Sequence, residues 1–150
     1  MLELQAQGAL NINLVTPLHF APTVREAVLL ARENGLAIPT VCNTSGYELP
    51  EVVRAMSDVI DIWLTDFKYA SPALAGLALG CARLPKRCRS GFGRDGLRRK
   101  RGSGRLVGED GAMKRGVIVR HLVLPGHVAI PARSLTACGI PAATRRTSRS

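Results

Sequence analysis

The chain has few cysteines, few aromatic residues and no long apolar run, and each shortage excludes a class of protein. Its four cysteines, at positions 42, 81, 88 and 138, form no C-x-x-C pair and no evident disulfide framework. No apolar run reaches the roughly 18 residues of a membrane span. The N-terminal residues do not show the charged and apolar regions of a secretory signal. We therefore expect a globular protein of the reducing cytoplasm, with a mostly aliphatic core and no membrane partner.

Acidic residues are scarce in the second half of the chain. Residues 1–75 hold eight acidic and four basic groups, a balance of −4, whereas residues 76–150 hold three acidic and seventeen basic groups, a balance of +14. Residues 83–105 alone carry ten Lys or Arg against one Asp, and such a stretch can neutralise phosphates. Because Phe92 is the only aromatic residue there to stack on a base, a solvated, disordered segment is the favoured interpretation over a nucleic-acid-binding module.

The first 70 residues alternate between short apolar runs and helical patterns, which is typical of an α/β fold. Four apolar runs, 11–15, 36–41, 59–64 and 117–124, each end at a small polar cluster. In α/β barrels and open sheets, active sites usually lie at the carboxyl ends of the parallel strands and are built from polar residues there. The pattern predicts parallel strands with a ligand site at their carboxyl ends.

Helix signals separate these runs. Thr23 and Glu26 have the spacing of a capping box, and Asn34-Gly35 supplies a left-handed end to the same helix. Pro50 suits the first turn of a second helix. Apolar residues recur at helical spacing in the first of these helices, at Val24, Ala27, Val28 and Ala31.

Three polar residues after the second run, Asn43, Thr44 and Ser45, could hydrogen-bond a polar ligand, although an ordinary turn leading into a helix is the favoured interpretation of this segment taken alone. Asp66 and Lys68 are more specific candidates for a ligand site, because side chains at i and i+2 of a strand point the same way. They could bind a zwitterionic ligand, Lys68 could form a Schiff base as in an aldolase, or the two could form a surface ion pair.

The last apolar run contains Arg120 and His121. A buried arginine needs a partner, so Arg120 implies an ion-pair partner or a ligand, whereas His121 taken by itself is best interpreted as a core histidine.

Four segments taken together resemble one family. They are residues 11–17, 43–48, 61–69 and 120–126, with the sequences NINLVTP, NTSGYE, DIWLTDFKY and RHLVLPG. The segments are similar to those of radical S-adenosylmethionine (SAM) proteins of the pyruvate formate-lyase activating enzyme type, over residues 1–70 and about 108–128. The resemblance implies a partial (β/α) barrel of about four parallel strands that holds SAM and a [4Fe–4S] cluster. Such enzymes generate a 5′-deoxyadenosyl radical and abstract hydrogen from a glycyl-radical-type protein partner.

The resemblance also implies a set of cofactor-binding residues. Thr16 falls where relatives carry a Gly-Gly-Glu-Pro strand end that binds the SAM amino group. Asp66 and Lys68 match an Asp-x-Lys motif, and Asn43 and Thr44 match a strand end that contacts SAM. The implied SAM site comprises Thr16, Asn43, Thr44, Ser45, Asp66, Lys68 and His121.

The chain departs from the family in two ways. The C-x-x-x-C-x-x-C loop that holds the cluster is absent, so we expect the chain to begin after that loop and to be inactive alone. The stretch 76–105 and the tail from 130 lose the family pattern, and we hypothesise that they are translated out of frame. We expect a partial radical SAM barrel at 1–75, a disordered basic segment at 76–106, a returning barrel strand at 107–128 and a disordered tail at 129–150.

Overall fold

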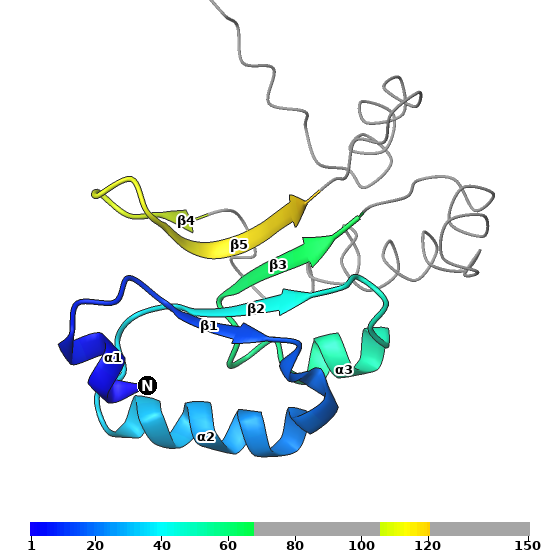
Figure 1. The fold of residues 1–150 in the computed structure, drawn as a ribbon, viewed down its shortest axis with the longest axis horizontal. Helices are drawn as coiled ribbons and strands as arrows, with labels where there is room; N and C mark the ends of the chain where they lie inside the picture. The colour runs from blue at the N-terminus through cyan, green and yellow to red at the C-terminus, as the bar shows by residue number, and fades with distance from the viewer. Residues whose placement is uncertain (68–105, 121–150) are drawn as a thin grey trace, which may run out of the picture.

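The computed structural model describes residues 1–67 and 106–120, which form one five-stranded sheet in the order β1-β2-β3-β5-β4 (Figure 1). The strands are β1 (Ile12–Val15), β2 (Thr40–Thr44), β3 (Ile62–Asp66), β4 (Leu106–Val107) and β5 (Met113–Arg120). Each neighbouring pair among β1, β2, β3 and β5 is parallel, whereas β4 pairs with β5 in the antiparallel sense. The predictions of an α/β fold and of about four parallel strands are confirmed.

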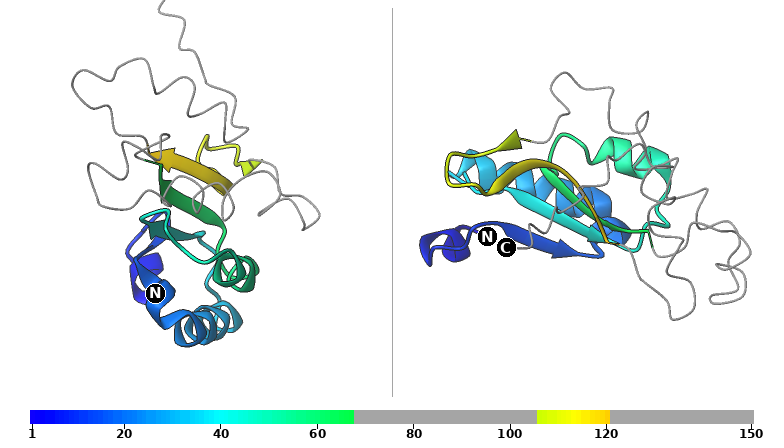
Figure 2. Two further views of the ribbon diagram at one scale, coloured as in Figure 1. Left: turned by 90° about the vertical axis from the view of Figure 1, so that its right-hand side faces the viewer. Right: turned by 90° about the horizontal axis from the view of Figure 1, so that it is seen from above.

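Helices connect the first three strands. They are the 3-10 helix η1 (Pro17–Phe20), α2 (Ala21–Glu33) and α3 (Pro50–Ala55), whereas α1 (Leu2–Ala6) precedes β1. The connecting helices α2 and α3 lie on one face of the sheet in all three views (Figures 1 and 2). Within the described ranges no helix combines the length and the apolar character needed to cross a membrane. The disorder predicted for 76–106 and 129–150 falls on residues outside the described ranges, except at Leu106, which begins β4.

The start of α2 differs from the predicted capping box. The helix begins at Ala21 with Phe20 as its N-cap, and no side chain caps it. Thr23 and Glu26 therefore lie inside the first turns, and both are exposed. The helix starts three residues early because η1 leads directly into it and Pro22 is tolerated in a first turn, where its missing N–H has no intrahelical acceptor.

The end of α2 is as predicted. Gly35 has φ +94, and its N–H donates to the carbonyl of Arg32 at 3.0 Å. The N–H of Leu36 donates to the carbonyl of Ala31 at 2.9 Å, which completes a Schellman motif. Leu36 is buried by this turn, so the glycine both ends the helix and directs the chain back to the sheet.

Two strands lie later in the chain than the apolar runs suggested. β2 begins at Thr40, since Pro39 has no N–H for the ladder and supplies only its carbonyl, to Ile12 N at 2.9 Å. β3 begins at Ile62, because the N–H groups of Val59 and Ile60 are used to close the turn after α3. The shift places Asn43, Thr44 and Asp66 inside strands rather than beyond them.

The core lies between the sheet and its helices. Val28 of α2 and Val53 of α3 are fully buried and pack in one cluster with Cys42 of β2 and Trp63 of β3. Of the predicted apolar stripe on α2, Ala27 is exposed and does not join the core.

The hairpin formed by β4 and β5 was not predicted. Gly111 has φ +74 in its turn, and the N–H of Gly108 donates to the carbonyl of Ala112 at 2.8 Å. Asp110 adds an ion pair with Lys114 at 2.9 Å across the same turn. The two-residue β4 is too short to give a strand signal in sequence, which is why only β5 was expected.

Candidate functional site at the carboxyl edge of the sheet

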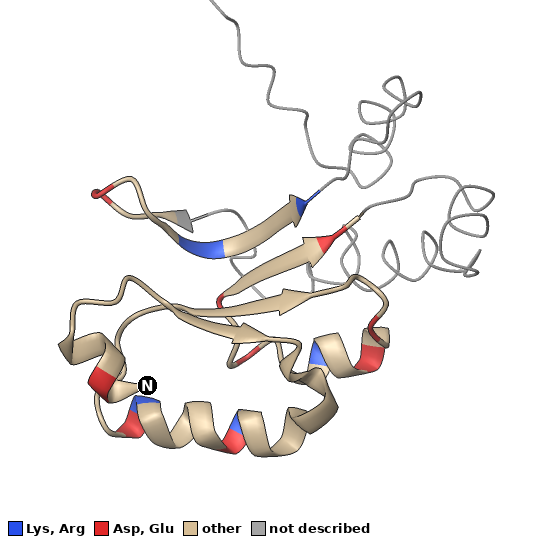
Figure 3. Ribbon diagram, in the orientation of Figure 1, with Lys and Arg blue, Asp and Glu red and all other residues tan. Residues whose placement is uncertain are grey.

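Three polar side chains from three neighbouring strands meet at the carboxyl edge of the sheet. Arg120, at the end of β5, donates from Nε to Asp66 Oδ1 at 2.7 Å and from Nη2 to Asn43 Oδ1 at 2.8 Å. Figure 3 shows the acidic end of β3 beside the basic end of β5. The pairing follows from register, because Asp66 and Arg120 are partners in the parallel ladder. We call these three residues the edge cluster.

The two charged members of the edge cluster differ in burial. The side chain of Asp66 is 9% exposed, whereas that of Arg120 is 48% exposed. A guanidinium carries five N–H donors, and hydrogen bonds to the described residues use two of them. Arg120 thus has the partner that its sequence context required, although it is half exposed rather than buried. Its remaining donors can bind an anionic group from solution.

The edge cluster lies on the face of the sheet opposite the helices. Side chains alternate along a strand, and Cys42, Trp63 and Phe67 belong to the core on the helix-covered face. Asn43 and Asp66, which are neighbours of these residues in sequence, therefore point to the other face.

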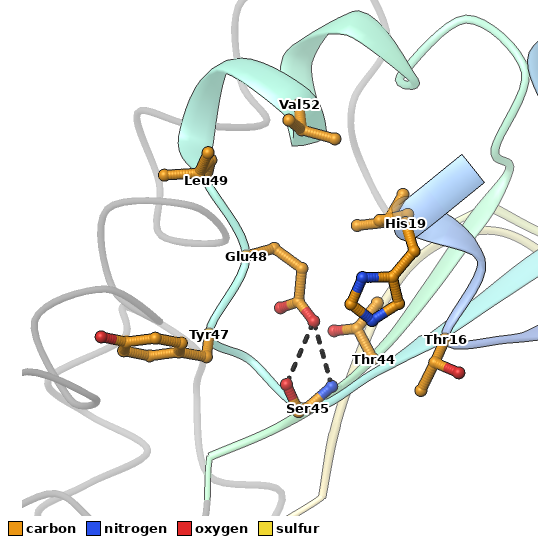
Figure 4. A pocket seen from close by; sticks show the side chains of 9 residues that line it. Thr16, His19, Thr44, Ser45, Tyr47, Glu48, Leu49 and Val52 are labelled. Atoms are coloured by element: carbon orange, nitrogen blue, oxygen red, sulfur yellow. Dashed lines mark hydrogen bonds between the residues drawn. The ribbon is translucent and has the colours of Figure 1, made fainter. Parts of the chain in front are cut away.

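A pocket of about 330 Å³ opens on the helix-covered side of the same edge (Figure 4). It lies where η1 approaches the end of β2 and the start of α3. Its polar lining comes from Thr16, His19, Thr44, Ser45 and Glu48, and its apolar lining includes Leu18, Leu49 and Val52.

Glu48 is a pocket residue that the sequence interpretation missed. Its Oε1 accepts hydrogen bonds from the N–H and the hydroxyl of Ser45, both at 3.2 Å. Its Oε2 is buried and has no hydrogen-bond partner within residues 1–67 and 106–120. The signal available in sequence was the Ser-x-x-Glu spacing of Ser45 and Glu48, which favours a hydrogen bond from the serine N–H to the glutamate side chain. Here it closes a turn before α3 rather than capping the helix.

Thr16 occupies a strained position beside this pocket. Its φ of 48 and ψ of 44 place it in the left-handed region, which is unfavourable for a β-branched residue. Its N–H donates to the carbonyl of Asn43 at 2.9 Å, and η1 begins immediately after it. The turn fixes the side chain at the rim of the pocket, and backbone strain of this kind is more common at functional sites than elsewhere.

The structure divides the predicted site residues into two groups. Thr16, Thr44 and Ser45 line the pocket, while Asn43 and Asp66 belong to the edge cluster. The Thr44 hydroxyl donates to the Thr65 hydroxyl at 3.4 Å, on the pocket side. Lys68 and His121, and with them the predicted Asp-x-Lys pair, lie outside the described residues.

Cys42 is the one cysteine in the described part of the chain. It is fully buried in the core, and burial, together with the negative charge of Glu48, raises the pKa of its thiol to about 12. The group is therefore a protonated thiol at neutral pH, and thiolate is the form that metals bind. Across the described residues, no group of three His, Cys, Asp or Glu side chains could hold a metal ion.

The raised pKa of Cys42 predicts a loss of stability at high pH. The unfolded chain releases the thiol proton near pH 9, whereas the folded chain keeps it to about pH 12. The contribution of the Cys42 thiol to the free energy of unfolding is fully present below pH 9. It is lost between pH 9 and 12, at up to about 1.4 kcal/mol per pH unit. Urea unfolding at pH 8 and at pH 10.5 should show that the free energy of unfolding falls more between these pH values in the wild-type chain than in Cys42→Ala. Equal losses in the two proteins would contradict the assignment.

No protein-family model, no curated protein and no solved structure matches the chain. The features that bear on function are the chemistry of the edge cluster and the pocket, together with the resemblance of the four sequence segments.

Proposed function

We propose that the chain binds S-adenosylmethionine through the amino-acid end of that molecule, held by the edge cluster. The observation that carries the proposal is the meeting of Asn43, Asp66 and Arg120 at one edge, with charges of both signs. The methionine end of SAM bears an ammonium and a carboxylate. Arg120 has N–H donors that the described residues leave unused and that suit a carboxylate, and the Asp66 carboxylate beside it suits an ammonium, so the two charges match a zwitterion.

The arrangement also supports, as part of the proposal, a partial (β/α) barrel. Barrels carry helices outside their strands and place functional side chains at the carboxyl ends of the strands, facing inward. In this chain α2 and α3 cover one face, and the edge cluster lies on the opposite face at those ends.

The described residues do not fit a [4Fe–4S] cluster. Such a cluster needs several thiolates, the sequence has no C-x-x-x-C-x-x-C triplet, and Cys42 is a buried protonated thiol. The proposed function of this chain is therefore ligand binding, without radical chemistry. The protein partner that the resemblance implies stays a prediction. The nucleic-acid and Schiff-base alternatives depend on residues 83–105 and on Lys68, which lie outside the described ranges.

Calorimetric titration of the full chain with SAM tests the proposal. We expect saturable 1:1 binding to the wild-type chain and a loss of at least about tenfold in affinity for Arg120→Ala, because the ligand carboxylate loses a charge-assisted donor. Arg120→Lys should also bind weakly, since an ammonium cannot donate to Asp66, Asn43 and a carboxylate with the geometry of a guanidinium fork.

Arg115→Ala is the matched control for Arg120→Ala. Arg115 is an exposed residue of the same strand, five positions earlier, and its substitution changes the net charge equally. Alternation along β5 places it on the other face from Arg120. SAM binding should be unchanged in this variant. No binding by the wild-type chain, or an equal loss in both variants, would rule out the edge cluster as the site.

A further inference from the structure

The strand β1 forms an open edge of the sheet. Among the described strands it has β2 as its one neighbour. The N–H groups of Ile12 and Thr16 donate toward the β2 side, to carbonyls of Pro39 and Asn43 at 2.9 Å. Because hydrogen-bonding direction alternates along a strand, the backbone N–H and C=O groups of Asn13 and Val15 point away from β2. These groups form a short template for another strand.

This edge lacks two features that often protect an edge strand, a charged side chain and a bulge. No Lys, Arg, Asp or Glu occurs between residues 4 and 24, and β1 pairs with β2 in continuous register without a bulge. The flanking apolar side chains are also open to solvent. Leu10 is 74% exposed, Val15 is 63% exposed and Phe20 is 70% exposed.

We propose that β1 pairs with β1 of a second copy of this chain, in the antiparallel sense. A two-fold axis perpendicular to the strands relates two identical edges in that sense and closes the assembly as a dimer. The edge is self-complementary. Antiparallel pairing places the Ile12 and Leu14 side chains of both copies on the helix-covered side and those of Asn13 and Val15 on the other, and no like charges meet. The two sheets become one continuous sheet. The inference is independent of SAM binding.

Sedimentation velocity of the full chain over a concentration series tests this proposal. We expect the wild-type chain to pass from monomer to a discrete dimer. Val15→Lys should raise the dimer dissociation constant at least about tenfold, because a charged side chain at an edge opposes strand pairing. Leu30→Lys is the matched control, since Leu30 is 61% exposed but lies on α2, and its variant should dimerise like the wild-type chain.

Hydrogen exchange at the two outward amides gives a second measurement that does not depend on any variant. The N–H groups of Asn13 and Val15 should be protected at concentrations where the dimer forms and should lose protection on dilution. The proposal is overturned by a wild-type chain that stays monomeric, or by a dimer that Val15→Lys and Leu30→Lys affect equally. Concentration-independent protection of the two amides would also overturn it, because it would show that the edge is covered within one copy.

Discussion

Replacing Trp63 by Ala is expected to lower the free energy of unfolding by about 3–5 kcal/mol, the largest effect of any single substitution considered for this chain. Trp63 is 3% exposed, in the cluster that joins β3 to Val28 of α2 and Val53 of α3. Removing the indole leaves a cavity that the two helices and the sheet cannot close by relaxing around it. Because domains of this size have marginal stability, we expect Trp63→Ala to unfold at a much lower urea concentration than the wild-type chain.

Circular dichroism during urea unfolding measures this effect, since the variant lacks the tryptophan that fluorescence would use. Leu64→Ala is the control on the same strand. Leu64 points to the face opposite the helices and is only partly buried, so its loss should cost less than half as much. Equal losses for Trp63→Ala and Leu64→Ala would show that the main core does not lie between the sheet and its helices.

Replacing Asp61 by Ala is expected to cost about 2–3 kcal/mol, through unpaired polar groups rather than a cavity. Asp61 Oδ2 accepts from Thr40 N at 2.9 Å, from Thr40 Oγ1 at 3.0 Å and from Arg32 Nη2 at 2.9 Å. Thr40 is fully buried, so its N–H would lose its acceptor without gaining water. The contact joins the start of β2, the start of β3 and the end of α2.

Glu51→Ala is the matched control for Asp61→Ala, because it removes the same charge from an exposed position in the first turn of α3. Its cost should stay below about 1 kcal/mol. Chemical denaturation of the two variants and the wild-type chain under one buffer condition gives the comparison. A loss in Asp61→Ala no larger than that in Glu51→Ala would show that the contacts of Asp61 are not structural.

Local patterns were sufficient to predict α2, α3 and the four parallel strands, but they did not predict α1, η1 or the two-residue β4. The glycine after α2 and the proline that opens α3 act within one turn, and both were correctly predicted from sequence. The first and last residues of the elements were less predictable, because they depend on contacts between residues far apart in the sequence. β2 starts at Thr40 because Pro39 can supply only a carbonyl to Ile12, and that pairing is set by the sheet.

The predicted site residues that the structure describes lie at the carboxyl edge of the sheet, but they fall into two groups on opposite faces. Asn43, Thr44 and Ser45 were expected together in a turn, whereas Asn43 and Thr44 are consecutive strand residues and so point to opposite faces. Arg120 joins the edge cluster from 54 positions beyond Asp66, a separation that carries no local signal. Glu48 reaches the pocket through a three-residue spacing that is also common in ordinary turns.

Comparing two ligands tests the central claim most directly. SAM and 5′-methylthioadenosine share the nucleoside and the S-methyl group, although the sulfur is a cationic sulfonium in SAM and a neutral thioether in 5′-methylthioadenosine. Only SAM carries the ammonium and carboxylate that the edge cluster is proposed to bind, and Arg120→Ala separates this contribution from that of the sulfonium. Titrated against the wild-type chain, SAM should bind at least about tenfold more tightly, and Arg120→Ala should remove most of that difference. Equal affinity of the wild-type chain for the two ligands would contradict the claim that Asn43, Asp66 and Arg120 form an amino-acid site.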